Sequence, residues 1–129
     1  MEHNFNADEM YGDNYGYMSS LNKSMVSHLK LKALSLKKRY NFKETNNILD
    51  IGSNDGTFLS FFNSKFKLFG CDPTIKKFSK YYRRDIVKLP HFFSSKIFND
   101  KKFNLITSIS MFYDLPDPLN FAKEINSIL

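Results

Sequence analysis

The sequence is poor in cysteine, in long apolar runs and in targeting signals. Cys71 is the only cysteine among 129 residues, which excludes an intramolecular disulfide framework and a metal cluster built from several cysteines. No apolar run approaches the ~18 residues of a membrane-spanning helix. The polar, acidic start MEHNFNADEM lacks the basic segment and apolar core of a signal peptide. We therefore expect a protein of the reducing cytoplasm with no membrane partner.

The sequence also has little arginine, although it is basic. Nineteen Lys and Arg against thirteen Asp and Glu give a net charge of +6, and because residues 1–16 carry −4, residues 17–129 carry +10. Only three of the basic residues are arginines, the side chain best suited to bidentate contacts with phosphate and guanine. We therefore predict a solvated, lysine-rich surface in preference to a nucleic-acid interface.

No internal repeat, low-complexity tract or Gly/Ser/Pro-rich linker divides the chain. With 42% apolar and 25% charged residues, the composition is that of a globular protein, and the length suits one domain. Residues 1–18 lack hydrophobic periodicity and are predicted to form an N-terminal arm. Residues 19–129 are predicted to form the domain.

Apolar periodicity predicts an amphipathic helix near each end of this domain. The first covers residues 19–40 and has Ser19 or Ser20 as its N-cap. Its apolar positions are Leu21, Met25, Leu29, Leu31, Leu34 and Leu36. The last covers residues 119–129 and begins after a cap at Asp117-Pro118. Its apolar face is expected to hold Leu119, Ala122, Ile125 and Leu129.

Between these two helices, short apolar runs alternate with helical segments. Strands are predicted at residues 48–51, 67–71, 86–93 and 104–109. Pro90 indicates that the third strand is irregular or lies near a sheet edge. Helices are predicted from Gly56-Thr57 onward and over residues 74–82. The alternation indicates an α/β fold with a parallel sheet, and right-handed crossovers would put helices on both of its faces.

The most informative segment joins the first predicted strand to the next helix. It reads Asp50-Ile51-Gly52-Ser53-Asn54-Asp55-Gly56-Thr57, and Asp72 follows at the end of the second strand. Glycine in such a turn permits positive φ and lets a ligand approach backbone N–H groups at a helix start. A carboxylate at the end of the neighbouring strand can accept two hydrogen bonds from a ribose diol. Because Asn54 replaces the second glycine of G-x-G-x-x-G, we expect a nucleoside without phosphates.

These residues resemble a known family. ILDIGSNDGTFLSFF is similar to the first motif of class I S-adenosylmethionine (SAM) dependent methyltransferases, and LFGCDPT resembles their acidic second motif. More narrowly, three stretches resemble the nucleotide-sugar C-methyltransferases. They are YGYMSSLNKSMVSHL, DIGSNDGT and ISMFYDLPDPLNFAKEI. The resemblance implies a Rossmann-like fold, SAM as cofactor, and methyl transfer to the enolate of a nucleotide-linked keto-deoxysugar.

The resemblance also implies which residues of the glycine turn hold the cofactor. Gly52, Ser53 and Gly56 would form the turn against the methionine part of SAM, with Asn54 between them. Asp50, at the end of the first strand, would support that turn.

Further cofactor-binding positions are implied outside the turn. Asp72 would bind the ribose hydroxyls, and Phe93, at the end of the third strand, would lie near the adenine. Met111 and Phe112 would follow the fourth strand and flank the cofactor, while Tyr17 would close over the site.

The family resemblance does not assign a catalytic residue here. A sugar carbon becomes nucleophilic only when a base removes a proton beside a ketone, and the family supplies such groups, a histidine included, after the fourth strand and its helix. We therefore expect residues 19–129 to match the first four strands of a seven-stranded sheet and to hold no metal. The alternative is a non-catalytic SAM-binding fragment or interaction module, which would form an oligomer or join a complementing C-terminal half.

Several residues keep two interpretations at this point. Asp50 can order the loop or contact the ligand, and Asp72 can be a turn residue before Pro73 or can bind the ribose, which is favoured. Asp55 is favoured as a carboxylate at a helix start over a contact to SAM. His28 and His91 are expected to be surface or packed residues. The N-terminal tyrosines can form a lid or an anchor: Tyr11, Tyr15 and Tyr17. The run from Tyr81 to Arg84 is predicted to be a solvated helix end.

Overall fold

The computed structural model describes residues 18–42, 46–109 and 117–129. The elements are, in chain order, η1 (Ser19–Leu21), α2 (Lys23–Arg39), β1 (Asn47–Ile51), η2 (Leu59–Phe61), β2 (Lys67–Cys71), α3 (Ile75–Phe78), η3 (Ser79–Tyr81), β3 (Val87–Leu89), η4 (Ser95–Phe98), β4 (Leu105–Thr107) and α4 (Pro118–Ile128). Here η denotes a 3₁₀ helix. No helix of the described residues is long and apolar enough to cross a membrane.

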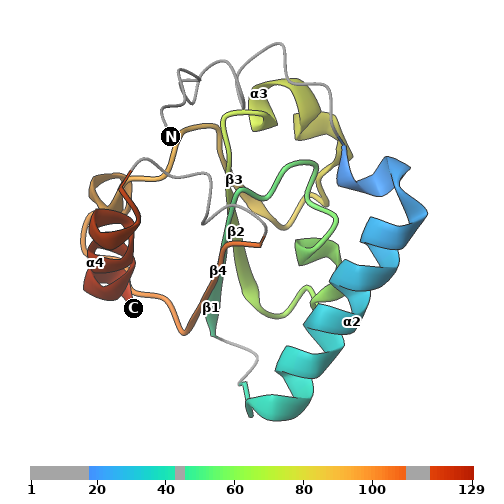
Figure 1. The fold of residues 1–129 in the computed structure, drawn as a ribbon, viewed down its shortest axis with the longest axis horizontal. Helices are drawn as coiled ribbons and strands as arrows, with labels where there is room; N and C mark the ends of the chain where they lie inside the picture. Colours follow the sequence, from blue (N-terminus) through green and yellow to red (C-terminus); the bar gives the residue numbers. More distant parts are fainter. Residues whose placement is uncertain (1–17, 43–45, 110–116) are drawn as a thin grey trace.

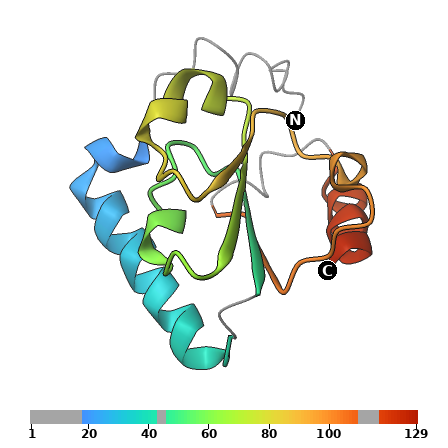
Figure 2. The same ribbon diagram turned by 180° about the vertical axis from the view of Figure 1, so that it is seen from behind.

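The four strands form one parallel sheet in the order β3-β2-β1-β4. In Figure 1 the sheet stands in the middle, with α2 on one side and α4 on the other, and Figure 2 shows the same layers from behind. The predicted α/β fold is therefore confirmed. The third strand lies at an edge, as Pro90 predicted, although β3 is shorter than the segment 86–93.

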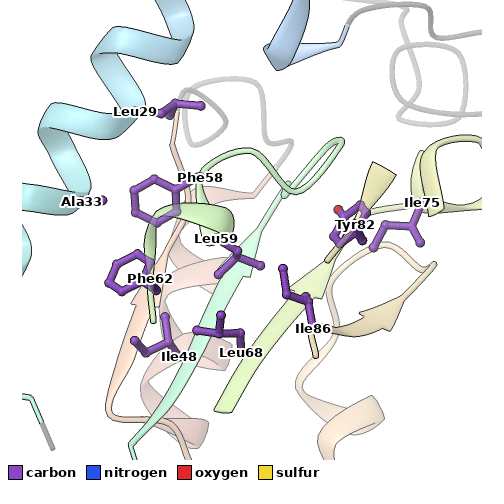
Figure 3. Packing of buried hydrophobic residues seen from close by; sticks show 10 residues of the cluster. All are labelled: Leu29, Ala33, Ile48, Phe58, Leu59, Phe62, Leu68, Ile75, Tyr82 and Ile86. Carbon is purple, nitrogen blue, oxygen red and sulfur yellow. The ribbon is translucent and has the colours of Figure 1, made fainter. Parts of the chain in front are cut away.

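Alternate residues of the two central strands supply two hydrophobic cores, because successive side chains point to opposite faces of a sheet. On the α2 side, Ile48 and Leu68 pack with Leu29 and other apolar side chains, as Figure 3 shows. On the α4 side, Leu49 and Phe69 pack with a second set of apolar side chains. The same alternation leaves Asp50 and Gly70, which are register partners, on the α2 side of the sheet.

The predicted first helix is present, but its cap and its buried face differ from the prediction. Asn22 is the N-cap, and its side chain accepts a hydrogen bond from the Met25 amide. The buried residues of α2 are Leu29 and Ala33, and Met25 and Leu36 are partly buried against them. The exposed apolar residues of this segment are Leu21, Leu31 and Leu34. Leucines occur on more than one side of this helix, so their spacing alone does not identify the face that meets the sheet.

The last helix also begins where predicted, but only part of its predicted apolar face points inward: Ile125 packs against the second core. Asp117 caps α4 by accepting from the Asn120 amide over 3.1 Å. Phe121 and Ile128 are the buried residues, whereas Leu119 and Leu129 are exposed and Ala122 is exposed as well. The aromatic ring of Phe121 packs against Phe93, so Phe121 belongs to the face of the helix that meets the second core.

The segments between the strands are less helical than the sequence predicted. After Gly56 the chain makes only the 3₁₀ turn η2, which ends at Phe62, and Asn63 then accepts from the Lys65 amide in a tight turn. The predicted helix over residues 74–82 is divided into α3 and η3. Burial of Phe58, Leu59 and Phe62 holds the first segment in place without a longer helix.

Candidate functional site

The candidate site lies at the carboxyl ends of β1 and β2. The described residues around it enclose a cavity of about 120 Å³, at the place where open parallel sheets bind their ligands. It is lined by Ser19, Met25, Leu29, Asp50, Ile51, Gly52, Ser53, Asn54, Phe58, Cys71, Asp72, Pro73, His91, Phe92, Phe93 and Ile109. Two of these are buried carboxyl groups, and no lysine or arginine lines the cavity within the described part of the chain.

The glycine turn after β1 adopts the left-handed backbone that its sequence predicts. Gly52 has φ 77°, Asn54 φ 54° and Gly56 φ 82°, a region that glycine and asparagine enter at the lowest steric cost. Three amides of this turn already donate within the protein: that of Gly52 to Cys71 O, that of Asn54 to Asp72 Oδ2, and that of Gly56 to Ser53 O. These three amides are therefore already bonded within the protein, and the helix predicted after the turn is the single turn η2.

Asp72 connects the glycine turn to the start of α3. Its Oδ2 accepts from the Asn54 amide over 2.8 Å, and its Oδ1 accepts from the Thr74 amide over 2.8 Å and from Thr74 Oγ1 over 2.7 Å. Burial raises the pKa of this carboxyl, and the Thr74 and Asn54 hydrogen bonds oppose that rise. A carboxylate has about four acceptor positions, and groups of the described residues fill three of those of Asp72.

Asp50 is the second buried carboxyl of the cavity. Its Oδ1 accepts from Thr107 Oγ1 over 2.7 Å, across the β1–β4 pair. Burial raises the pKa of Asp50 to about 7, the Thr107 hydrogen bond opposes this, and the charge of Asp72 adds to it. The two carboxyl groups are therefore close enough to interact, and the site has a negative potential whenever both are ionised.

The remaining polar side chains of the turn bond to protein groups. Ser53 Oγ lies 2.7 Å from Tyr82 Oη, and Asn54 Oδ1 accepts from the Ser19 amide over 2.9 Å. Asp55 Oδ2 accepts from the Ser20 amide, while its Oδ1 accepts from Thr57. Asp55 does not line the cavity within the described residues. The geometry therefore favours Asp55 as a residue that orders the start of the segment after the turn, in preference to a ligand contact.

Comparison with known proteins places this geometry in a family. A protein-family model described as a methyltransferase domain matches residues 25–129, which is more than half of the chain. The chain belongs to this methyltransferase family. The match and the parallel sheet support a class I SAM-dependent methyltransferase with a Rossmann-like fold, and the family generally uses SAM. No curated protein matches the chain.

The aromatic end of the methyltransferase cavity comes from the segment after β3. Phe93 lines the cavity, and its ring also packs at 5.3 Å from Phe121 and 6.1 Å from Phe98. Phe92, its neighbour, is 37% exposed and lines the same cavity. His91 is exposed, and its carbonyl oxygen accepts from the buried Cys71 thiol over 3.3 Å. His28, on α2, is exposed too, as expected.

Three of the predicted cofactor-binding residues lie outside the described residues: Tyr17, Met111 and Phe112. The same holds for Tyr11 and Tyr15. The other seven line the cavity or form its glycine turn: Asp50, Gly52, Ser53, Asn54, Gly56, Asp72 and Phe93.

Sequence reasoning missed two residues that hold the methyltransferase site together. Thr107 is the polar residue of β4 and the register partner of Asp50, but only the strand order reveals this pairing. Tyr82 was assigned to a solvated helix end, and this prediction is wrong, since Tyr82 is 6% exposed and contacts the glycine turn. Its neighbour Tyr81 is 52% exposed. Tyr82 directly follows the Ser79–Tyr81 turn, and no signal in the sequence chooses between the two adjacent tyrosines.

Proposed function

We propose that this methyltransferase domain binds SAM at the carboxyl ends of β1 and β2 and takes part in methyl transfer from it. The observation that carries the proposal is the pair of buried carboxyl groups, Asp50 and Asp72, in a cavity whose described lining has no basic side chain. Buried negative charge is costly unless a partner compensates it. A ligand with positive charge supplies that compensation, and SAM carries both a sulfonium and an ammonium group.

The same charge distribution disfavours a dinucleotide. A pyrophosphate needs free amides or basic side chains, whereas the amides of Gly52, Asn54 and Gly56 are already used. The volume of about 120 Å³ is below the ~300–1,000 Å³ of pockets that enclose a whole drug-sized ligand. The described lining therefore suits one part of an extended ligand such as SAM.

We infer the following contacts from the resemblance and the positions of the residues. Asp72 offers a carboxylate oxygen to a ribose hydroxyl, and Phe93 lies where the adenine would stack or pack. The turn of Gly52, Ser53, Asn54 and Gly56 faces the methionine part, and Asp50 balances its positive charge. Tyr17, Met111 and Phe112 complete the proposed set on the resemblance alone.

We propose a nucleotide-linked keto-deoxysugar as the methyl acceptor, with a carbon atom as the nucleophile. The support is the resemblance of three separate stretches to the nucleotide-sugar C-methyltransferases. SAM, when bound, supplies an electrophilic methyl group, so the protein's main task is to align the acceptor at ~3 Å in line with the departing sulfur. The base that would form the enolate is not assigned to any described residue.

Calorimetric titration with SAM and with S-adenosylhomocysteine (SAH) tests the cofactor proposal. We expect binding of both, weakened at least tenfold by Asp72→Ala and by the closer isostere Asp72→Asn, each checked for folding by circular dichroism. Asp100→Ala is the matched control, because Asp100 is exposed and outside the cavity, and it should bind like the wild type. Absence of binding by the folded wild type, or full affinity in Asp72→Asn, would reject the proposal.

The acceptor is tested separately by incubating the chain with SAM and a nucleotide-linked 4-keto sugar. Mass spectrometry would show a gain of one methyl group on the sugar, and a shift of the carbon resonance would identify the methylated atom. Transfer to oxygen or nitrogen would reject the C-methylation part while leaving the SAM site intact.

A second candidate is a non-catalytic SAM-binding or interaction module. It is favoured by one observation: in the described part of the chain β4 pairs only with β1, so its other edge can accept a further strand. This candidate predicts SAH binding without methyl transfer and self-association or association with a complementing partner. A monodisperse monomer in light scattering that also methylates the sugar would reject it.

We also propose residues 19–129 as the folded unit. The support is that the amides of Ser19 and Ser20 bond to Asn54 and Asp55 of the glycine turn, which joins the start of η1 to the site. Limited proteolysis should trim the chain to a product that begins close to Ser19 and retains the SAH affinity of the full chain. A product that begins within α2 would contradict this boundary.

A further inference from the structure

Tyr82 follows η3 and lies under the glycine turn, on the α2 side of the sheet. It is buried at 6% exposure and belongs to the core cluster that contains Ile75 and Ile86, beside which Figure 3 shows it. Tyr82 does not line the cavity within the described residues. Any effect on a ligand therefore acts through the residues that it contacts.

The hydroxyl group of Tyr82 makes two hydrogen bonds to the glycine turn. Tyr82 Oη donates to the carbonyl oxygen of Asn54 over 2.6 Å, and it lies 2.7 Å from Ser53 Oγ. A phenol has one proton, so Ser53 Oγ is the donor in the second bond. Ser53 thus directs its hydroxyl proton at Tyr82 rather than at the cavity.

The ring of Tyr82 packs against two glycines, one in the turn and one in β2. A Cβ atom on Gly56 would lie 2.9–3.1 Å from three ring atoms, and a Cβ on Gly70 would lie 3.1 Å from Tyr82 Cε2. Such distances are below van der Waals contact, so both positions need glycine to admit the ring. The ring fills the space between the turn and β2, and this packing opposes a shift of the turn toward the sheet.

Burial, with a smaller contribution from neighbouring charges, keeps this hydroxyl in its protonated, donating form. Burial raises the pKa of Tyr82, the Ser53 hydrogen bond opposes the rise, and the charges of Asp72, Asp50 and Asp55 add to it. The phenol therefore stays protonated through the pH range in which proteins are studied.

We propose that Tyr82 is a positioning residue of the SAM site: its hydroxyl and ring hold the turn from Ser53 to Gly56 in the conformation that binds the ligand. This inference rests on the proposed function. It assigns no contact between Tyr82 and the ligand. The affinity of the site then depends on a side chain that the ligand does not touch.

Tyr82→Phe tests the role of the hydroxyl because it keeps the ring between Gly56 and Gly70. The two lost hydrogen bonds leave Ser53 Oγ and the Asn54 carbonyl without this partner, and we expect SAH to bind about five- to thirtyfold more weakly. Tyr81→Phe is the matched control, since Tyr81 is adjacent and 52% exposed, and it should bind SAH like the wild type. Calorimetry is done at a temperature at which all three proteins are fully folded, so that a loss of global stability alone leaves the dissociation constant unchanged.

Amide hydrogen exchange without ligand provides an independent measurement. In Tyr82→Phe the amides of Asn54 and Gly56 should exchange faster, while the amides of β1 and β2 below the turn keep their protection relative to global stability. A double-mutant cycle with Ser53→Ala adds a second check. Ser53→Ala should weaken SAH binding by a smaller factor in the Tyr82→Phe background than in the wild type, because the bond between the two hydroxyls is already lost.

The outcomes separate the two proposals. A wild type that binds SAH, together with a Tyr82→Phe variant of equal affinity and equal exchange, overturns the positioning role and leaves the SAM site intact. A folded wild type that does not bind SAH overturns the proposed function. Faster exchange confined to the turn in Tyr82→Phe would then still support Tyr82 as the residue that holds the turn.

Discussion

Thr107 donates a hydrogen bond from its Oγ1 to Asp50 Oδ1 over 2.7 Å, and the two residues are register partners in the parallel β1–β4 pair. Asp50 is 3% exposed, and burial raises its pKa to about 7. Near neutral pH this carboxyl group therefore exists in both protonation states inside the candidate site. Strand β1 thus carries a titratable group whose charge is expected to affect both stability and ligand binding.

Asp50→Asn should change the pH dependence of stability. The carboxyl group ionises near 3.8 in the unfolded chain and near 7 in the fold, so between these values the unfolded state releases the proton first and the fold loses stability as the pH rises. This loss of folding stability is complete above about pH 7 and absent below about pH 4. We expect Asp50→Asn to exceed the wild type by on the order of 2–4 kcal/mol at pH 8 and to match it near pH 4, measured by urea unfolding.

Asp85→Asn is a control for which the pH dependence of stability should have the opposite sign. Hydrogen bonding to Arg83 lowers the pKa of Asp85, so this group contributes stability above its ordinary pKa and loses it as the pH falls through the lower folded value. The variant should be slightly less stable than the wild type at pH 8 and equal to it in strong acid. Equal effects of Asp50→Asn at pH 4 and pH 8 would contradict the ionisation account.

Gly70→Ala should destabilise the fold by overpacking the space under the glycine turn. The new Cβ would lie 2.7 Å from Ser53 Oγ and 3.1 Å from Tyr82 Cε2, and neither group can move without disturbing their mutual hydrogen bond. We expect a loss of about 1–3 kcal/mol in the free energy of unfolding. Lys88→Ala, at the exposed register partner on β3, should stay within about 0.5 kcal/mol. A Gly70→Ala protein as stable as Lys88→Ala would show that the turn is free to move.

The strands and the position of the site could be predicted from the sequence because each rests on a local signal. Apolar runs bounded by Gly52 and by Asp72-Pro73 define β1 and β2, and parallel strands bring their carboxyl ends together. That Asp50 and Asp72 share one cavity follows from these two facts. The family resemblance points to the same place for the site, at the carboxyl ends of β1 and β2.

The inward faces of the helices could not be predicted from the sequence, because they depend on tertiary contacts. In α2 the small residue Ala33 is buried and the larger Leu31 is exposed, since Ala33 lies over the core beside Leu29. From hydrophobicity alone, Leu31 would be expected to be more buried than Ala33. In the same way, only the position of the glycine turn above β2 distinguishes the buried Tyr82 from the exposed Tyr81.

The acceptor positions already used on Asp72 could not be predicted either. The motif identified the carboxylate, but the bonds from Thr74 and Asn54 come from its three-dimensional setting. A strand-end aspartate followed by Pro73 and Thr74 can cap its own turn, and here it does so while lining the cavity. The structural and the ligand-binding interpretations of this residue are therefore compatible.

Asn99→Gly should stabilise the protein. Asn99 has φ 52° and ψ −119° at the end of η4, a backbone region that is strained for any residue with a Cβ. Glycine relieves that strain at an exposed position, and we expect a gain of about 0.5–1 kcal/mol after its entropy cost. Thermal unfolding should show a raised melting temperature for Asn99→Gly and a lowered one for Asn54→Gly. Asn54 also has positive φ, but its side chain accepts from the Ser19 amide, so this variant should lose stability.

Leu29→Ala should weaken both the core and the site. Leu29 is 5% exposed and lines the cavity from α2, so its truncation is expected to cost about 2–4 kcal/mol of stability. Leu31→Ala, two residues away and 67% exposed, should cost less than about 0.5 kcal/mol. Urea unfolding measures the difference, and equal losses in the two variants would mean that α2 packs with another face.

Asp50→Asn should also change how the site discriminates between SAM and SAH. SAM carries a sulfonium charge that SAH lacks, and the ionised Asp50 carboxylate, which is buried, attracts that charge. At pH 8, where Asp50 is mostly ionised, the variant should raise the ratio of the SAM to the SAH dissociation constant by about three- to tenfold. At pH 5.5 the wild-type carboxyl is protonated, so wild type and variant should give the same ratio. Asp100→Asn, at an exposed position outside the cavity, should leave the ratio unchanged at both pH values. A ratio that is insensitive to Asp50→Asn at pH 8 would mean that this carboxylate does not face the sulfonium group.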